Sequence, residues 1–139
     1  MLRLNRAACE AMLRFDVHGC TDVTGFGLIG HARGLALASN VTLEIAVDRI
    51  RFLPGAVEYS RQGALSGGLH NNRDFASCAV EAACELPAEI ENLLYDPQTA
   101  GGLLIALPES DANLLERAYD GAYRIGRVLP RGPKAIRLV

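Results

Sequence analysis

The chain has 139 residues, of which 50% are hydrophobic, and its formal net charge at neutral pH is −2. This length and hydrophobic content indicate one folded domain, residues 1–139, and exclude a disordered chain. The charge is nearly balanced and no basic run occurs, so we expect no nucleic-acid partner. The longest apolar run, residues 103–107, is far too short to span a membrane. No signal peptide is recognisable, and we expect a cytoplasmic protein without membrane contact.

The four cysteines have spacings that point away from zinc and from disulfides. Cys9, Cys20, Cys78 and Cys84 form no C-x-x-C pair, and no histidine lies at a zinc-finger spacing from them. We therefore expect reduced thiols, with Cys9 and Cys78 as small core residues. Cys20, close to Asp22, is either an ordinary or a reactive thiol, because reactivity requires a lowered pKa.

The first part of the sequence contains two helical patterns separated by a glycine-containing segment. Apolar residues repeat at helical spacing over residues 4–15, which predicts a helix there. Residues 19–24 are expected to form a loop, and Thr24 is a candidate N-cap for a second helix that runs to about residue 39. Asn40 is expected to end that helix. Its expected inner positions are Leu28, Ala32, Leu35 and Ala36.

The middle of the chain mixes strand, helix and loop signals. Residues 42–47 alternate apolar and polar side chains, which predicts a half-buried strand with Glu44 on its outer face. A short helix is expected within residues 54–63, between a proline and a glycine. Residues 63–75 are rich in glycine and asparagine and predict a long loop. Residues 76–83 fit either a strand or a helix.

The last part of the chain predicts alternating helices and strands. A short helix is expected to begin at Pro87, and the apolar run 103–107 is expected to be a central strand covered on both faces. Ser110 is expected to cap a following helix, whose inner residues are Leu114, Leu115 and Ala118. The final two strands are expected at 123–128 and 135–139, around a proline-glycine turn. This order of elements implies an α+β layered sandwich.

Residues 18–31 combine one carboxylate, two hydroxyls and several glycines just before the second helical pattern. Asp22 is a candidate Mg²⁺ ligand, because Mg²⁺ prefers hard oxygen donors and usually takes one or two carboxylates together with substrate phosphates. The alternative is that Asp22 only bonds the amides of its own turn. The glycines allow a phosphate to approach the backbone or, equally, helices to pack closely. The candidate phosphate-binding or nucleotide-binding residues here are Thr21, Thr24, Gly25 and Gly27.

A second segment, residues 96–106, begins 74 residues after that carboxylate and carries small residues ahead of the apolar run. Small residues at this place let backbone amides face a ligand, or let a neighbouring element pack closely. Its candidate phosphate-binding residues are Thr99, Gly101 and Gly102. In the expected long loop, Asn72 is a further candidate, with His70 and Arg73 beside it, and a solvated loop is the alternative. His31 is expected to be packed and hydrogen-bonded rather than catalytic.

These two segments together resemble the C-terminal domain of the selenophosphate synthetase (selenide, water dikinase) family, within the AIR-synthetase-like superfamily. The resemblance rests on residues 21–27, Thr-Asp-Val-Thr-Gly-Phe-Gly, and on residues 96–102, Asp-Pro-Gln-Thr-Ala-Gly-Gly, and it covers nearly the whole chain. Residues 67–72 also resemble a family segment. Departures from the family's usual patterns occur at Leu69, Asn71 and Ala100.

The resemblance implies an α/β/α sandwich whose mixed sheet has a partly ferredoxin-like topology. It also implies an enzyme that makes selenophosphate, AMP and phosphate from ATP, selenide and water, with Asp22 holding Mg²⁺ on the nucleotide phosphates. In the family, the catalytic Cys or selenocysteine, the catalytic Lys and the other metal carboxylates lie in an N-terminal domain, and the full enzyme is a homodimer. None of the four cysteines here matches the catalytic one. The chain alone is therefore expected to be inactive.

Two other functions remain open from the sequence. The chain is also compatible with a domain of another ATP-dependent enzyme of the same superfamily. It is equally compatible with a phosphate-binding or nucleotide-binding module that carries out no chemistry. No Ser/His/Asp or Cys/His arrangement for nucleophilic catalysis is apparent in the sequence.

Overall fold

The computed structural model describes residues 4–139 as an α+β domain with two sheets, which confirms the expected fold class. Its helical elements are α1 (Arg6–Met12), α2 (Gly27–Ala38), η1 (Val47–Arg49), α3 (Ala56–Arg61), α4 (Gly68–Ala76), η2 (Ser77–Ala79), α5 (Ala88–Tyr95) and α6 (Glu109–Ala118). Its strands are β1 (Gly19–Asp22), β2 (Val41–Ile45), β3 (Val80–Ala82), β4 (Leu103–Ala106), β5 (Gly126–Pro130) and β6 (Ile136–Leu138). Over this range no helix combines the length and apolarity needed to cross a membrane.

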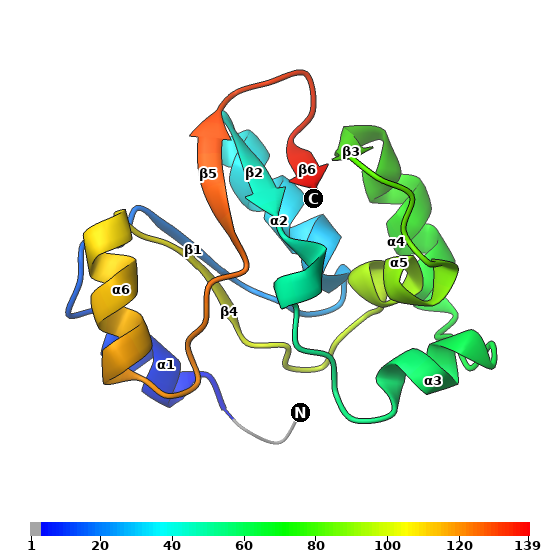
Figure 1. Cartoon of the computed structure of the whole chain (residues 1–139), viewed down its shortest axis with the longest axis horizontal. Helices are drawn as coiled ribbons and strands as arrows, with labels where there is room; N and C mark the ends of the chain where they lie inside the picture. Colours follow the sequence, from blue (N-terminus) through cyan, green and yellow to red (C-terminus); the bar gives the residue numbers. More distant parts are fainter. Residues whose placement is uncertain (1–3) are drawn as a thin grey trace.

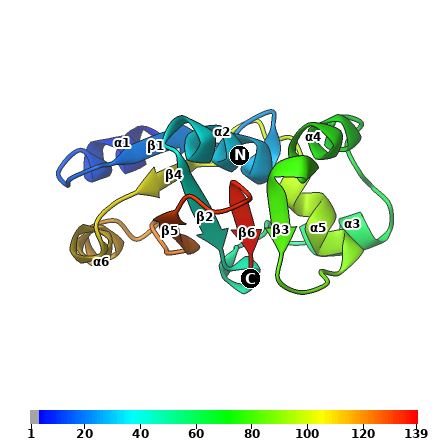
Figure 2. The same ribbon diagram turned by 90° about the horizontal axis from the view of Figure 1, so that it is seen from above.

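The larger sheet has the strand order β3-β6-β2-β5 and is mixed, because β2 runs parallel to β6 and antiparallel to β5. Helix α2 lies along one face of it (Figures 1 and 2). Apolar side chains from α2 and the strands fill the core between them, among them Ile29, Ala32, Ala36, Leu43, Ile45, Ile136 and Leu138. The second predicted helix is thus confirmed with its inner face. Asn40 follows its end in the left-handed region, at φ 52°.

The polar side chain of the central strand β2 is buried rather than exposed. The expectation that Glu44 lies on an outer, solvated face is wrong, since only 8% of this residue is exposed. Its carboxylate accepts a hydrogen bond from Nε of Arg127 at 2.6 Å and lies 3.4 Å from Nη1 of Arg137. These arginines come from β5 and β6, which flank β2 on both sides. A central position therefore buries both faces of a strand that alternates in sequence.

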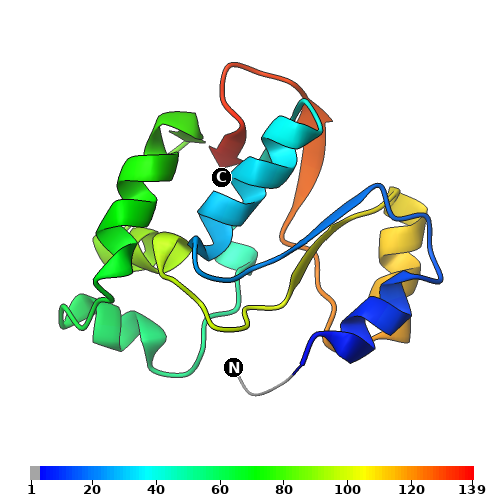
Figure 3. The same cartoon turned by 180° about the vertical axis from the view of Figure 1, so that it is seen from behind.

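Strands β1 and β4 form a separate two-stranded antiparallel ribbon, in which Asp22 pairs with Leu103. Figures 1 and 3 show it running from the start of α2 to the end of the domain that carries α1 and α6. Two expectations are wrong here. Residues 19–24 begin with a strand rather than forming a loop, and the run 103–107 is not a central strand, since all residues of β4 are half-buried. Pairing between distant segments overrides the local preference of glycine, threonine and aspartate.

The long loop expected at 63–75 is also wrong, because α4 occupies most of it. Leu69, Asn72 and Ala76 point to the interior at helical spacing and are buried. The loop was expected because glycine and asparagine are poor helix formers. Packing against α2 and α5 stabilises this helix more than its propensity disfavours it.

Two predicted helix caps are absent from the described structure. Phe26 rather than Thr24 is at the N-cap of α2, and Pro108 rather than Ser110 is at the N-cap of α6; neither makes a side-chain cap. Pro108 has an extended backbone, and α6 begins at the next residue, Glu109. Leu114 is 49% exposed, so its expected inward position is wrong, whereas Leu115 is buried.

The remaining boundaries differ from expectation by a few residues. Helix α1 is shorter than the predicted span 4–15. The ambiguous segment 76–83 contains η2 followed by the edge strand β3. The last two predicted strands are confirmed as β5 and β6, although they lie on opposite sides of β2 rather than pairing with each other.

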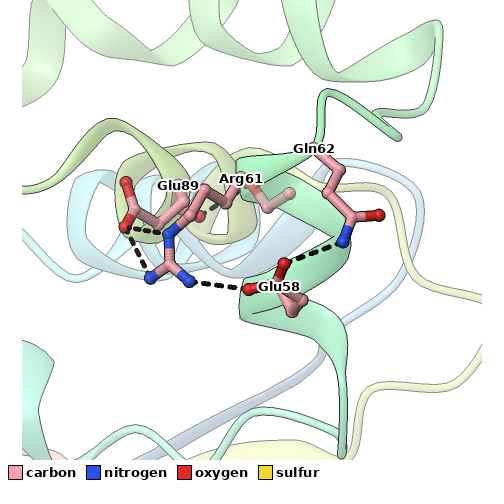
Figure 4. A network of polar contacts seen from close by, with 5 residues as sticks. Glu58, Arg61, Gln62 and Glu89 are labelled. Atoms are coloured by element: carbon pink, nitrogen blue, oxygen red, sulfur yellow. Dashed lines mark hydrogen bonds and ion pairs between the residues drawn. The ribbon is translucent and has the colours of Figure 1, made fainter.

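Helices α3 and α5 are joined by a polar network (Figure 4). Arg61 of α3 bonds Glu58 at 2.7 Å and reaches across to Glu89 of α5 at 3.0 Å. The Ser60 hydroxyl donates to the main-chain oxygen of Glu89 at 2.9 Å. The backbone N–H of Glu89 and the Arg61 guanidinium both lower the pKa of the Glu89 carboxyl, so the carboxylate is charged at neutral pH. The network fixes α5, whose end leads into the second motif.

Candidate functional site

The two sequence motifs lie side by side although 74 residues separate Asp22 from Asp96. Beyond the β1–β4 pairing, Val23 N donates to Gly102 O at 3.0 Å and Gly101 N donates to Val23 O at 2.8 Å. The contact continues at the next residue, where Gln98 N donates to Thr24 O at 3.0 Å. Figures 1 and 3 show both segments running together past the N-terminal end of α2. The backbone thus unites the two candidate phosphate-binding segments in one place.

Asp22 is the exposed last residue of β1, at the point where the ribbon meets these hydrogen bonds. Among residues 4–139 no hydrogen bond or ion pair engages its carboxylate, so the alternative of a turn-capping aspartate is not what the structure has. The same residues contain no group of three or more His, Cys, Asp or Glu side chains placed to hold a metal. One carboxylate alone is an incomplete ligand set for Mg²⁺, which takes one or two carboxylates together with other oxygen donors.

The hydroxyls of the first motif are engaged locally. Thr21 Oγ1 donates to the main-chain oxygen of Asp22 at 3.1 Å. Thr24 Oγ1 lies 3.1 Å from Nε2 of His31, and Phe26 N donates to the same nitrogen at 3.4 Å. Both contacts converge on one ring nitrogen of His31, which ties the start of α2 back to the first motif. His31 therefore shapes the turn from α2, in the packed and hydrogen-bonded role expected of it.

The glycines divide into packed and open positions. Gly27 has φ 67°, and a Cβ there would lie 2.8 Å from the carbonyl carbon of Tyr95. A Cβ on Gly101 would lie 2.8 Å from the Val23 oxygen. By contrast, nothing lies within 4 Å of a Cβ placed on Gly25 or Gly102. Close backbone packing explains the first two glycines, whereas the space beside the last two is open, and Gly102 also has φ 99°, a conformation that favours glycine.

Asn72 of α4 reaches the same place from the interior. Its side-chain nitrogen donates to Gly25 O at 2.9 Å and to Tyr95 O at 2.9 Å. The residue is 7% exposed. The structure thus ties the buried Asn72 to the first motif and to the residue that precedes the second.

Comparison with known proteins agrees with this geometry. The family model described as "AIR synthase related protein, C-terminal domain" matches residues 1–139. The chain belongs to this AIR synthase related family. Selenide, water dikinase of Clostridium botulinum Eklund 17B is 40% identical over 140 residues, which cover 98% of this chain and 41% of that protein. Selenide, water dikinase of Clostridioides difficile 630 is 38% identical over 144 residues, covering 100% of this chain and 41% of that protein. Selenide, water dikinase of Porphyromonas gingivalis W83 is 41% identical over 126 residues, covering 91% and 35%.

These similarities confirm the resemblance found in the two motifs. The chain spans about two fifths of the length of the curated relatives it matches. The matched stretch in those proteins therefore corresponds to this AIR synthase related domain, and the rest of each protein lies outside it.

The remaining residues that the sequence suggested for ligand binding lie at the margin of the site. Thr99 is exposed, in the connection between α5 and β4. His70 is exposed on α4, and Arg73 is engaged by Asn92 at 2.8 Å and by Glu91 at 3.5 Å. None of these contacts links His70 or Arg73 to Asp22.

Sequence reasoning missed two contacts that shape the domain around the site. Ser66 Oγ donates to Oδ1 of Asp96 at 2.8 Å, which ties the start of the second motif to the segment before α4. Phe26 packs against Phe75 with ring centroids 5.6 Å apart, and the Arg33 guanidinium lies 4.4 Å from the centre of the Phe75 ring. An aspartate before a proline was the only signal for the first contact, and the second had none because its residues are far apart in sequence.

The cysteines of the domain are free thiols in the structure, and their surroundings differ. Cys78 is exposed, so its expected core position is wrong; it follows the end of α4 at the surface. Cys20 is partly buried on β1. Burial, and secondarily the neighbouring Cys9 and Asp22, raise the pKa of its thiol. A raised pKa leaves less thiolate at neutral pH, which favours the ordinary-thiol interpretation of Cys20.

We expect the rate at which iodoacetamide alkylates each cysteine at neutral pH to follow its exposure and its thiolate fraction. Cys78 and Cys84 are exposed and should be modified first, and Cys20 should be modified roughly tenfold more slowly because both access and thiolate fraction are lower. Peptide mass spectrometry at successive times measures each rate, with the urea-unfolded chain as the reference for equal access. Preferential labelling of Cys20 in the folded chain would identify it as an activated thiol.

Proposed function

We propose that this chain is the C-terminal domain of a selenide, water dikinase, which forms selenophosphate, AMP and phosphate from ATP, selenide and water. One observation carries the proposal: an exposed carboxylate, Asp22, lies where two glycine-rich segments are held together by the β1–β4 ribbon. Exposed oxygen donors and open backbone are the groups that a magnesium-bound phosphate requires. The name shared by relatives about 40% identical to the chain supports the same reaction.

In this proposal the chain supplies one wall of the nucleotide site. Asp22 holds Mg²⁺, which when bound neutralises charge on the phosphates. The backbone N–H groups of Gly25 and Gly102 and the exposed Thr99 face the phosphate oxygens, whereas Thr21, whose hydroxyl donates to the main-chain oxygen of Asp22, fixes the backbone beside the metal ligand. Three further residues shape this wall from behind, namely Thr24 through His31, and Gly27 and Gly101 through close packing. The chain's contribution is to bind and orient the phosphates, because phosphoryl transfer depends mainly on positioning and on charge neutralisation.

The remaining parts of the reaction are assigned to a preceding domain. The curated relatives extend well beyond the matched region, since it covers 41% of their length. We propose that this N-terminal domain supplies the further metal carboxylates and the catalytic Cys or selenocysteine and Lys. The full enzyme would be a cytoplasmic homodimer with ATP and selenide as its small-molecule substrates.

The assay that tests this function compares the full-length protein with the 139-residue chain. Given ATP, Mg²⁺ and selenide, the full-length protein is expected to form selenophosphate and AMP in equal amounts. The chain alone should form neither above background, because most of the positioning groups are elsewhere. Phosphorus NMR resolves selenophosphate, AMP and phosphate in one spectrum. Sustained product formation by the chain alone would show that no second domain is needed, and turnover of ATP without selenide consumption would favour another reaction of the superfamily.

A further inference from the structure

Asn72 occupies a singular position behind the proposed phosphate site. It lies on α4, a helix that sequence reasoning took for a loop, yet its amide contacts the first motif and the residue that precedes the second motif. One hydrogen bond, of 2.9 Å, goes to Gly25 O in the turn that follows Asp22. The other, also of 2.9 Å, goes to Tyr95 O, immediately before the Asp96 motif. Among the side chains of residues 4–139, Asn72 alone joins these two places by hydrogen bonds.

Both hydrogens of the Asn72 amide are used by these two carbonyls, and the residue is 7% exposed. An amide group has only two donors, so none remains for a phosphate oxygen. Asn72 thus does not fit the role of a phosphate ligand for which the sequence made it a candidate.

Gly27 and Asn72 both lie against the Tyr95 carbonyl. It belongs to the last residue of α5, where main-chain oxygens lack partners within the helix. Gly27 packs directly against it, since a Cβ there would lie 2.9 Å from this oxygen. The absence of a side chain at Gly27 lets α2 and α5 approach, and Asn72 satisfies the carbonyl that this approach buries.

We propose that Asn72 is a positioning residue that fixes the spacing of the two phosphate-binding segments. The ribbon holds these segments together, through Val23, Thr24, Gln98 and Gly101. Asn72 adds a buried connection from α4 to Gly25 and to Tyr95, next to the second segment, and Ser66 reinforces it by bonding Asp96. We call the two hydrogen bonds from Asn72, to Gly25 O and Tyr95 O, the Asn72 clamp. The proposal rests on the proposed function for the identity of the ligand, but the clamp is a property of the chain alone.

The first test measures the clamp without any ligand. In Asn72→Ala, the amides of Gly27, Gln98 and Gly101 should exchange their hydrogens at least tenfold faster relative to the amides of β2. These three amides donate the hydrogen bonds that define the site. Asn71→Ala is the matched control, because it changes the same residue type at an exposed position of the same helix. Hydrogen exchange followed by NMR gives each rate separately.

A second control separates positioning from general loss of stability. Leu138→Ala opens a cavity in the core, far from Asn72 in sequence, and its buried side chain makes it strongly destabilising. It should accelerate exchange throughout the domain in parallel. If Asn72→Ala gives that same parallel pattern, the clamp does not exist and the proposal is overturned. Asn72→Ser, which keeps one donor, replaces the alanine variant if the latter does not fold.

The third measurement connects the clamp to the ligand. In the full-length enzyme, Asn72→Ala should raise KM for Mg·ATP about tenfold, whereas Leu138→Ala, compared at equal distance below its melting temperature, should leave KM unchanged. Selective exchange without a change in KM would overturn the positioning role even though the clamp is present. If the wild-type enzyme uses neither ATP nor selenide, the proposed function fails, and the exchange measurements still decide whether Asn72 clamps the two segments.

Discussion

Asp22→Asn is expected to lower turnover of the full-length enzyme by about 10³-fold while leaving its melting temperature nearly unchanged. The substitution keeps the shape of the side chain and removes the charge that would hold Mg²⁺. Metal neutralisation of phosphate charge is worth several kcal/mol of barrier, and about 4 kcal/mol corresponds to roughly 10³ in rate. The cost in stability should be at most about 1 kcal/mol, because Asp22 is exposed at the end of β1 and its carboxylate has no partner among the described residues.

Turnover and melting temperature must be measured on the same preparation of this variant. Asp120→Asn is a suitable control, since it removes the same charge at an exposed position outside the two motifs. It should change neither quantity. If Asp22→Asn melts and turns over normally, Asp22 is a surface residue and the metal assignment is wrong. A large fall in melting temperature would instead give Asp22 a structural role.

Elements whose signal is local were predictable from the sequence. The helix α2 follows from apolar spacing along a single segment, and it is confirmed. Asn40 was predictable as a helix end because asparagine tolerates the left-handed region it occupies. In these cases the residues that form the element also carry the information that specifies it.

Elements specified by distant partners were not predictable in this way. Residues 19–22 read as a loop, and they form a strand only because β4 pairs with them. Glu44 read as exposed, and its burial depends on Arg127 and Arg137 more than 80 residues further along the chain. Helix α4 read as a loop, since its glycine and asparagines are poor helix formers and packing decides its conformation.

The candidate site shows the same division. The sequence supplied the residue types of both motifs, and the carboxylate among them, without any long-range information. It did not supply the ribbon that joins the motifs or the use to which Asn72 is put. The chemistry of a site lies in a few side chains, whereas their arrangement depends on pairings that become visible only in the fold.

Gly27→Ala should destabilise the domain by about 3 kcal/mol and so lower its melting temperature by roughly 10 °C. Gly27 is buried at the start of α2 with φ 67°, a conformation that costs an alanine about 1–2 kcal/mol. The added Cβ would lie 2.8 Å from the carbonyl carbon of Tyr95 and 3.0 Å from the Asp96 oxygen. Because these neighbours are backbone atoms, α2 and α5 must move apart, and the Asn72 clamp on Tyr95 should loosen with them.

Gly34→Ala provides the control on the same helix. Gly34 is exposed in the middle of α2 with nothing within 4 Å of an added Cβ, so this variant should be more stable by about 0.5–1 kcal/mol. Thermal unfolding followed by circular dichroism measures both changes against the unmodified chain. The opposite signs expected for the same substitution in one helix exclude helix propensity as the cause. An unchanged melting temperature for Gly27→Ala would mean that α2 and α5 are not in the close contact on which the arrangement of the site depends.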